Sequence, residues 1–476
     1  MLTSTHQAIY FALLVVAMTF SLPWTPAGLP SRASGATPNM APVAISAAPV
    51  VPTDGASNEG SNPVGRDSLL SESGAMRDGG AVMMLPTMRR ILAKKDSLWE
   101  RALRLHYDAI VVDGHVDTPT LMLDRGYDMG ARHSSRTAHV DLPRMYEGGL
   151  DATFFALYVA PGYGESEQAL RRASNMIQEV QRQLEARPDS VALVLSADEL
   201  VRVTREGRKA ILLGLEGGHA IGGSPDALRD LYQRGVRYVT LTHINSNSFA
   251  DASQSRPRWN GLNEKGRRIV REMNRLGMIV DVSHASDSTF FDALKESTAP
   301  ILLSHSSVRA LSSSVRNASD DMLRALAERN GLIMINFFDA LVNPHVTDEF
   351  MDEVLRRLPG GSLVNLWNGV YDLKSERGLP GAHLTHVVDH IDHAVRVAGV
   401  DHVGLGSDFD GVFDLPAGLD DVTRLPWITY ELLKRGYSET EVRKLLGGNL
   451  IRLLHGVEQE AARLQRIEAG ATSSRR

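Results

Sequence analysis

The residues of this chain that could do chemistry gather at the ends of six apolar segments. Histidine and carboxylate side chains are ligands that catalytic zinc sites use, and a carboxylate can also act as a general acid or base. The chain has no cysteine, so it could hold a metal only through His, Asp and Glu. These residue types predict a catalytic metal site, and the residues concerned are His115, Asp117, Glu216, His243, His284, His305 and Asp408.

The positions of five of these residues predict ligands for two metal ions. His115 and Asp117 are two positions apart, so on a strand their side chains point the same way and can grip one ion. Glu216 has two oxygens that can bridge this ion to a second, although a capping role at a helix start is an equal alternative for a lone Glu. His284 and His305 each follow a serine at the end of successive segments. We therefore predict two Zn²⁺ ions per chain, bridged by Glu216 and about 3.5–4 Å apart.

Two further residues have predicted catalytic roles. Asp408, in GLGSDFDG, directly follows an apolar segment and could pass a proton from the attacking water to the leaving amine. Asp410 is the rival for this role. His243 is not needed as a ligand, so it could stabilise an oxyanion or lie hydrogen-bonded beneath the site.

Other chemically capable residues are weaker candidates. His219 lies close after Glu216, and we interpret it as a support for the site or as incidental. No G-x-S-x-G motif with plausible partners points to a serine nucleophile. A second histidine cluster has helical spacing, which favours a partly exposed helix face over a metal site; its members are His383, His386, His390 and His393.

The elements that must position these residues are eight short apolar segments alternating with helical patterns. Continuous apolar runs are typical of strands buried on both faces of a parallel sheet. Eight such units predict an α/β fold of the (β/α)8 TIM-barrel type, in which catalytic residues lie at the carboxyl ends of the strands. A doubly wound open sheet is the alternative, but no glycine-rich phosphate loop follows the first strand. The segments are residues 109–117, 152–159, 209–217, 236–243, 277–284, 300–306, 331–338 and 402–411.

Composition separates this barrel from an N-terminal extension. The net charge of −6 gives no reason to expect nucleic-acid binding. The apolar run of residues 9–20 is shorter than a membrane span and is typical of a secretory signal, with an uncleaved anchor as the alternative. We therefore expect an exported protein, periplasmic or extracellular, which is membrane-tethered only if this segment stays. The predicted domains are a signal peptide (1–24), a disordered low-complexity linker (25–87), the barrel (88–460) and a charged tail (461–476).

Six sequence motifs together resemble the membrane (renal) dipeptidase family. They are DGHVDTP, LGLEGGHAI, RYVTLTHINSNSFADA, NGLNEKGRRIVREMNRLGMIVDVSHAS, LLSHSSVRAL and GLGSDFDGV, and the likeness extends over about residues 108–455. The resemblance implies a two-zinc site with the five ligands His115, Asp117, Glu216, His284 and His305. It also implies that His243 contacts the substrate, that Asp408 is the acid/base group and that Arg316, in VRNASDD, holds the substrate carboxylate.

The activity implied by this resemblance is hydrolysis of the amide bond of dipeptides, including dipeptides with a D-residue at the second position, by a homodimer. One alternative is another metal-dependent hydrolysis on the same barrel, of a lactone, β-lactam or ester. The other alternative is a non-catalytic binding protein on the same scaffold, against which the presence of all five ligands argues.

Overall fold

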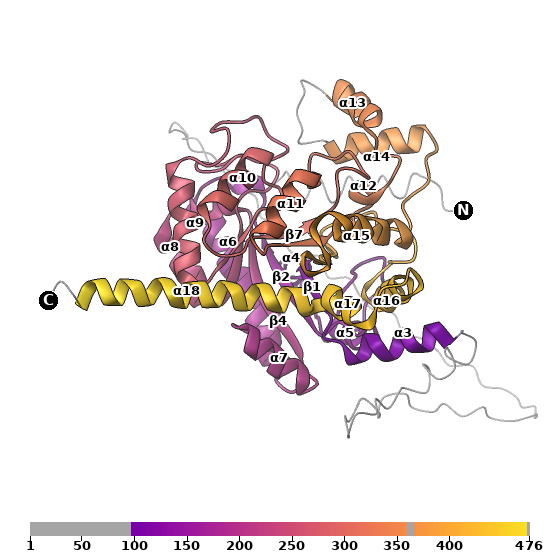
Figure 1. Cartoon of the computed structure of the whole chain (residues 1–476), viewed down its shortest axis with the longest axis horizontal. Coiled ribbons are helices and arrows are strands. Elements are labelled where there is room, and N and C mark those ends of the chain that lie inside the picture. The colour runs from indigo at the N-terminus through magenta and orange to yellow at the C-terminus, as the bar shows by residue number, and fades with distance from the viewer. Residues whose placement is uncertain (1–96, 359–365, 474–476) are drawn as a thin grey trace, which may run out of the picture. The chain divides into compact units, whose positions relative to one another are not determined.

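The computed structural model describes residues 97–358 and 366–473, which form a closed parallel barrel surrounded by helices (Figure 1). The strands follow the order β2-β1-β9-β8-β7-β6-β5-β4, and β4 pairs with β2 to close the ring. This confirms the predicted barrel, because each of the eight predicted segments contains one of these strands. Their bounds are β1 Val112–Val116, β2 Ala152–Tyr158, β4 Lys209–Glu216, β5 Val236–Thr240, β6 Ile279–Asp281, β7 Leu302–Ser306, β8 Leu332–Ile335 and β9 Val403–Leu405.

One further strand, β3 (Val191–Leu193), was not predicted. It pairs in parallel with the first half of β4, while β5 pairs with the second half of β4. The strand has only three residues, and Ala192 and Leu193 are only partly buried. Its apolar signal is therefore too short to stand out from the loop around it.

The helices cover the outside of the barrel. Helix α9 shows why they form where they do: the Asn263 side chain accepts hydrogen bonds from the first backbone N–H groups, and Gly277 ends the helix in a left-handed conformation. Ile269, Val270 and Met273 form its buried stripe. The α-helices are α3 Ser97–Asp108, α4 Thr118–Arg125, α5 Leu142–Glu147, α6 Glu167–Glu185, α7 Ala197–Arg205, α8 Pro225–Gln233, α9 Glu264–Leu276, α10 Asp287–Glu296, α11 Asp320–Glu328, α12 Asp339–Val342, α13 Asp348–Arg357, α14 Leu366–Glu376, α15 Leu384–Ala398, α16 Leu425–Lys434, α17 Glu439–Arg443 and α18 Asn449–Ser473.

The segment expected to be a charged tail from residue 461 begins inside helix α18. Ala461 is buried, and the Gln465 side-chain amide donates a 2.9 Å hydrogen bond to the Arg275 carbonyl on α9. Helix α18 therefore packs against the barrel's outer layer beyond the predicted boundary. The predicted signal peptide and linker, residues 1–87, lie outside the described residues.

Helices α12, α13 and α14 form an excursion between β8 and α15, and they lie together beside α15 in Figure 1. Their apolar side chains make a cluster separate from the barrel core, with Phe350, Val354, Leu366 and Val370 almost fully buried. The excursion and α15 together connect β8 to β9, the strand that leads to Asp408.

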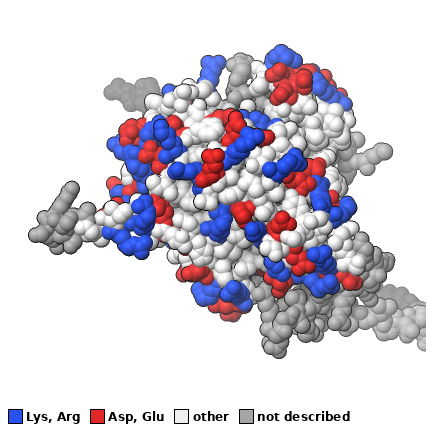
Figure 2. Space-filling model, viewed as in Figure 1, with Lys and Arg blue, Asp and Glu red and all other residues white. Residues whose placement is uncertain are grey.

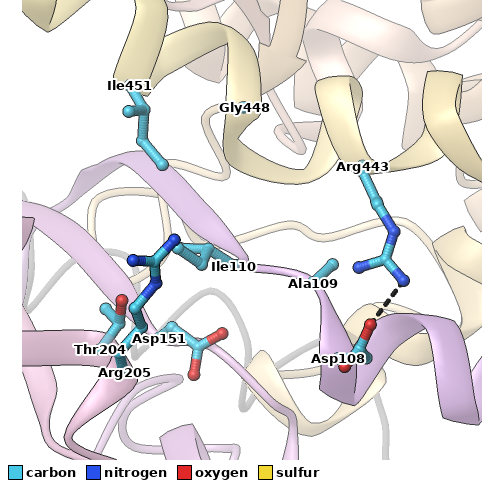
Figure 3. Close-up of a pocket in the computed structure, with 9 residues that line it drawn as sticks. All are labelled: Asp108, Ala109, Ile110, Asp151, Thr204, Arg205, Arg443, Gly448 and Ile451. Carbon is cyan, nitrogen blue, oxygen red and sulfur yellow. Dashed lines mark hydrogen bonds and ion pairs between the residues drawn. The ribbon is translucent and has the colours of Figure 1, made fainter. Parts of the chain in front are cut away.

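The surface carries charges of both signs, and Lys and Arg lie interspersed with Asp and Glu on the face seen in Figure 2. Within residues 97–358 and 366–473, no helix has both the length and the apolar character needed to cross a membrane. A hollow of about 290 Å³ lies where β1 and β2 begin, lined among others by Asp108, Asp151, Arg205 and Arg443 (Figure 3). None of its lining residues belongs to the predicted site, which is at the opposite end of the strands.

Candidate metal centre

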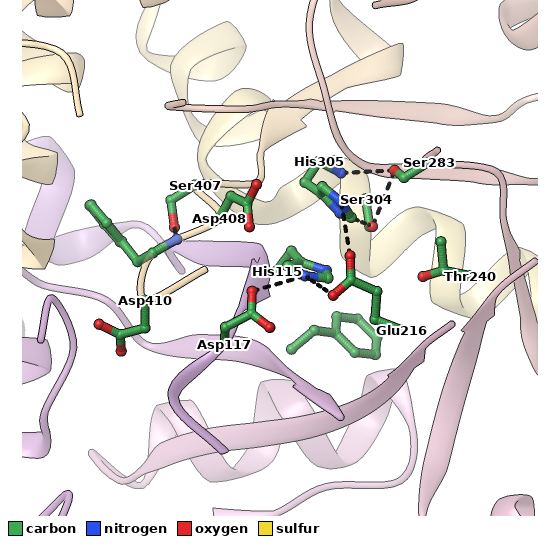
Figure 4. A network of polar contacts seen from close by, with 12 residues as sticks. His115, Asp117, Glu216, Thr240, Ser283, Ser304, His305, Ser407, Asp408 and Asp410 are labelled. Carbon is green, nitrogen blue, oxygen red and sulfur yellow. Dashed lines mark hydrogen bonds and ion pairs between the residues drawn. The ribbon is translucent and has the colours of Figure 1, made fainter. Parts of the chain in front are cut away.

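The carboxyl ends of the strands bring the predicted metal ligands together in the barrel mouth, where Figure 4 shows His115, Asp117, Glu216 and His305. His115 lies in β1, Glu216 is the last residue of β4 and His305 lies in β7. Asp117 directly follows β1, and His284 lies three residues beyond β6 with a left-handed backbone (φ 64°). All five side chains are buried. Residues up to 190 positions apart in the sequence thus meet because parallel strands end at one face of the barrel.

Glu216 lies between the other ligands, with its two oxygens facing different partners. Oε2 is 3.6 Å from His115 Nε2, while Oε1 is 3.1 Å from His284 Nε2 and 3.5 Å from His305 Nε2. Asp117 Oδ2 is 3.3 Å from His115 Nε2 on the first side. This division of partners is the one expected of a carboxylate that bridges two ions.

Ligand atoms close enough to share an ion also group in other ways. Three sets have all their ligand atoms within 4.8 Å of one another: His115, Glu216 and His305; Glu216, His243 and His284; and His115, Asp117 and Asp408. The sets overlap at His115 and Glu216, so they describe one continuous centre. How its ligands divide between two ions remains a prediction.

The polar atoms of this centre fit a cation. His115 Nε2 is buried and has no hydrogen-bond partner among the described residues, although it points at two carboxylates. Burial alone would lower the pKa of His115, but Glu216 and Asp117 outweigh burial and hold it well above its usual value. The free protein thus places a proton between these carboxylates. A metal ligand has to be deprotonated, so an ion bound here would take the place of that charge.

The remaining titratable ligands also suit a metal. Burial, followed by the charges of Arg316 and His243, lowers the pKa of His284 well below its usual value. Burial, followed by the charge of His115, does the same to the pKa of His305. Both imidazoles are therefore neutral, which is the form that binds metal. Burial also raises the pKa of Asp117 to about 8, a sign that this carboxylate lacks the positive charge it needs.

Asp408 lies at the metal centre, whereas Asp410 points away from it (Figure 4). Asp408 Oδ2 accepts a 2.9 Å hydrogen bond from the Asn336 side chain. Asp410 instead accepts hydrogen bonds from the Thr118 hydroxyl and the His139 backbone N–H, each 2.5 Å long. The geometry thus favours Asp408 over its rival as the group that could move a proton.

His243 and Arg316 lie at the same mouth. His243 Nε2 is 3.7 Å from Glu216 Oε1, and burial lowers the pKa of His243 to about 4, so its ring is neutral. The buried Arg316 guanidinium donates hydrogen bonds to Ser306 Oγ (3.3 Å) and the His305 carbonyl (3.2 Å). In the described part of the chain no carboxylate lies within 4 Å of this guanidinium, so a buried cation is available to an anionic ligand.

The weaker candidates have local roles. In the second histidine cluster, His383 caps α15 together with His386, His393 contacts Asp320, and none of the cluster belongs to a metal-binding group within the described residues. The predicted partly exposed face is wrong for His390, which is buried and accepts a 3.0 Å hydrogen bond from the Val308 N–H. His219 is buried near Glu216, as its position in the sequence suggested.

Sequence reasoning missed a layer of polar residues beneath the ligands. The Tyr238 hydroxyl lies 2.7 Å from His115 Nδ1, and Ser304 Oγ lies 2.8 Å from His305 Nδ1. Buried Asp113 and Asp281 accept hydrogen bonds from backbone groups at the strand ends. A possible signal was present, because each Asp interrupts an apolar run just before a histidine, in VVDGH and IVDVSH.

Comparisons with known proteins point to one family. The membrane dipeptidase family (peptidase family M19) matches residues 99–468. A protein named dipeptidase tcpJ from Claviceps purpurea is 36% identical over 372 residues, which cover 76% of each chain.

Solved structures show the same likeness. The probable dipeptidase PvdM from Pseudomonas aeruginosa has a TM-score of 0.68 at 25% identity, covering 76% of this chain and 99% of that one. A metallopeptidase from Rhodobacter sphaeroides, liganded with a phosphinate mimic of the dipeptide L-Ala-D-Ala, has a TM-score of 0.61 at 28% identity, covering 73% and 99%.

Proposed function

The chain belongs to the membrane dipeptidase family, and from this premise we propose that it is a two-zinc hydrolase that cleaves the amide bond of dipeptides. The observation that carries the proposal is the position of Glu216, whose two oxygens face His115 on one side and the pair of His284 and His305 on the other. One ion would be held by His115, Asp117 and Glu216. The other would be held by Glu216, His284 and His305.

Zinc bound at such a centre supplies a Lewis acid that activates water and polarises a carbonyl group. The chain's own residues supply the rest of the chemistry. Arg316 would bind the terminal carboxylate of the dipeptide, because its guanidinium is buried and has no carboxylate within 4 Å in the described chain. The neutral imidazole of His243 could donate a hydrogen bond to the oxyanion that develops at the scissile carbonyl.

Asp408 would carry a proton to the departing amine. Burial raises the pKa of Asp408, against the attraction of His115, so the carboxyl group takes up a proton more readily than an exposed Asp would. Asn336 holds one of its oxygens at 2.9 Å. A carboxylate oxygen of Asp408 lies within 4.8 Å of ligand atoms of His115 and Asp117, beside the position that the reacting water would take.

The substrates we propose include dipeptides with a D-residue at the second position. The relative from Rhodobacter sphaeroides binds a mimic of L-Ala-D-Ala. A guanidinium fork fixes the terminal carboxylate and not the side chain beside it, so this contact by itself does not select one configuration.

We also propose that the protein is exported, because residues 9–20 have the pattern of a secretory signal, and that it acts as a homodimer. Mass spectrometry of the N-terminus after expression with a secretory pathway tests the first proposal, and sedimentation tests the second. An N-terminus that still starts at Met1 on membrane-bound protein would instead indicate an anchor.

The deciding experiment combines metal analysis with hydrolysis of L-Ala-L-Ala and L-Ala-D-Ala before and after chelation. We expect about two zinc ions per chain, and we expect chelation to abolish cleavage and added zinc to restore it. Two metal ions without dipeptide cleavage would move the function to a lactone, β-lactam or ester. A chain without metal or activity would contradict the proposal, and Glu216→Ala, which removes the shared ligand, should reproduce the chelated state.

A further inference from the structure

We propose that Asp281, buried beneath the candidate metal centre, is a positioning residue that holds His115 and His305 ready to bind metal through the hydroxyl groups of Tyr238 and Ser304. This inference rests on the proposed two-zinc function. It adds a residue that touches neither a ligand imidazole nor the substrate.

Asp281 is a buried carboxylate held by hydrogen bonds alone. It is 0% exposed, and no Lys, Arg or His nitrogen in the described part of the chain lies within 4 Å of it. Oδ1 accepts from the backbone N–H groups of Ser283 (3.1 Å) and Ser304 (3.0 Å). Oδ2 accepts from the hydroxyls of Thr240 (2.6 Å) and Ser304 (2.7 Å). A buried charge without a counter-ion is costly, so its retention here calls for a role beyond stability.

An ionised carboxylate can only accept hydrogen bonds, so Asp281 sets the direction of every bond that leads to it. The Ser304 hydroxyl has to donate its single proton to Asp281, which leaves its oxygen free only to accept. His305 Nδ1, 2.8 Å from that oxygen, must then carry a proton and donate it. The other nitrogen of His305, Nε2, keeps its lone pair and faces Glu216 Oε1 at 3.5 Å.

The same logic extends to His115 through Tyr238. The Tyr238 hydroxyl hydrogen-bonds Ser304 and also lies 2.7 Å from His115 Nδ1. Donation by Tyr238 to Ser304 leaves the Tyr238 oxygen to accept from His115 Nδ1–H. In the neutral ring that binds a metal ion, the lone pair of His115 is then on Nε2, the nitrogen aimed at Asp117 and Glu216.

Local structure builds this chain of contacts. The register of β7 against β8 shifts between Leu303 and Ser306, which allows the neighbours Ser304 and His305 both to face the barrel interior. Gly214 lies against the Tyr238 ring, and a Cβ atom there would overlap it. The ring therefore has room to cross beneath His115 only because β4 carries a glycine at this position.

The remaining ligand histidine provides an internal contrast. His284 Nδ1 is buried and has no hydrogen-bond partner among the described residues, so Asp281 cannot orient it through this route. Groups that orient metal ligands from behind are worth about 10–100-fold in metal affinity. Loss of Asp281 should therefore weaken the zinc bound by His115 and the zinc bound by His305, while the contacts of His284 stay as they are.

The test measures zinc affinity by competition with a chromophoric chelator, for full-length protein carrying Asp281→Asn, Ser304→Ala or Tyr238→Phe. We expect Asp281→Asn and Ser304→Ala to lower the affinity for both zinc ions by about 10–100-fold, and Tyr238→Phe to lower it for one ion only. The matched control is Thr153→Val, which removes a fully buried barrel hydroxyl whose only side-chain hydrogen bond among the described residues joins the Phe154 carbonyl. It should bind zinc like the unmodified protein.

A second readout reports the tautomer itself. In the cobalt-loaded protein, the imidazole N–H protons of His115 and His305 should give shifted resonances that exchange slowly with water. Ser304→Ala should abolish the slow exchange of the His305 signal, an effect that a purely structural role would not produce.

The outcomes separate the two proposals. An unmodified protein that binds no zinc contradicts the proposed function. The inference alone is overturned if the unmodified protein binds two zinc ions and a folded Asp281→Asn variant binds them with the same affinity. It is also overturned if Thr153→Val loses as much zinc affinity as Asp281→Asn does. If Asp281→Asn fails to fold, Ser304→Ala decides the matter, because it keeps the carboxylate and removes only the link.

Discussion

Arg316 is a buried cation that faces no carboxylate within 4 Å in the described chain, and replacing it with methionine tests what it is for. Burial lowers its pKa from the ordinary 12.5 to about 10, which corresponds to roughly 3 kcal/mol against the charged form. The side chain recovers part of this through its two hydrogen bonds to Ser306 and the His305 carbonyl, about 1 kcal/mol each. We therefore expect Arg316→Met to fold with a Tm no lower than that of the unmodified protein.

The same substitution should be severe for catalysis. Removing one partner of a buried, charge-assisted pair typically costs about 2–4 kcal/mol, so kcat/KM for L-Ala-L-Ala should fall roughly 30- to 1,000-fold. The assay compares this substrate with L-Ala-L-Ala amide, which lacks the terminal carboxylate. The unmodified enzyme should prefer the free acid strongly, and Arg316→Met should lose that preference while cleaving the amide about as well as before.

Arg316→Lys is the matched control, because it keeps the charge but not the planar fork. The kcat/KM of Arg316→Lys for L-Ala-L-Ala should lie between those of the unmodified protein and Arg316→Met, with some preference for the free acid over the amide. A Tm several degrees lower in Arg316→Met, together with an unchanged preference for the free acid, would refute the reasoning. Arg316 would then be a structural residue that ties the end of β7 to its loop.

Two other perturbations test the site and the fold. Asp408→Asn should keep both metal ions and the Tm but lose most turnover. Asp410→Asn should instead lower the Tm and keep most turnover, because Asp410 accepts hydrogen bonds from Thr118 and the His139 backbone. Near-normal turnover in Asp408→Asn would contradict the acid/base role of Asp408. Burial lowers the pKa of His106 to about 4, while an unfolded His titrates near 6.5, so the stability this neutral ring provides is present above about pH 6.5 and is lost as the pH falls towards 4. His106 should thus lower the unfolding free energy of the metal-free protein by about 2 kcal/mol between pH 7 and pH 5. Chemical denaturation of His106→Gln should show a shallower dependence of the unfolding free energy on pH. The same dependence in both proteins would contradict the lowered pKa of His106.

The barrel could be predicted from the sequence because its signal repeats. Eight apolar runs separated by amphipathic stretches leave few alternatives, and the strands end close to the residues that the pattern singled out. Strand β3 was not predicted because it has only three residues, two of them partly buried, which is too short a segment to show a period. The α12–α14 excursion has its own apolar cluster, so nothing in its local pattern shows that it interrupts the βα unit formed by β8 and α15.

The site was predictable only in its first layer of contacts. Metal-binding residue types at strand ends are visible in a sequence, but the arginine is not, because Arg316 lies in a loop and enters the site only through the turn that follows β7. The resemblance to a family singled it out, whereas its position alone would have left it an ordinary loop residue. Tyr238 and Ser304 are likewise unremarkable inside apolar strands until the fold places them under the imidazoles.

The polar layer beneath the ligands follows one design at two places around the barrel. Asp113 accepts from the N–H of His115, two residues on, and from the N–H of Ser407 on the neighbouring strand segment. Asp281 accepts in the same way from Ser283 and Ser304. Each buried carboxylate thus clamps the ends of two adjacent strands just below the metal ligands.

This arrangement concentrates negative charge in the barrel mouth. Five carboxylates lie there, and the negative charges of Asp408, Glu216 and Asp281 act on the Arg316 guanidinium. The five carboxylates are Asp113, Asp117, Glu216, Asp281 and Asp408. Burying so many acids is unfavourable unless cations are added, and two divalent ions supply the missing charge. The buried Asp113 and Asp281 carboxylates hold the strand ends in place, but their negative charge also makes this arrangement dependent on bound metal. The placement of the ligands and the binding of metal therefore stabilise each other.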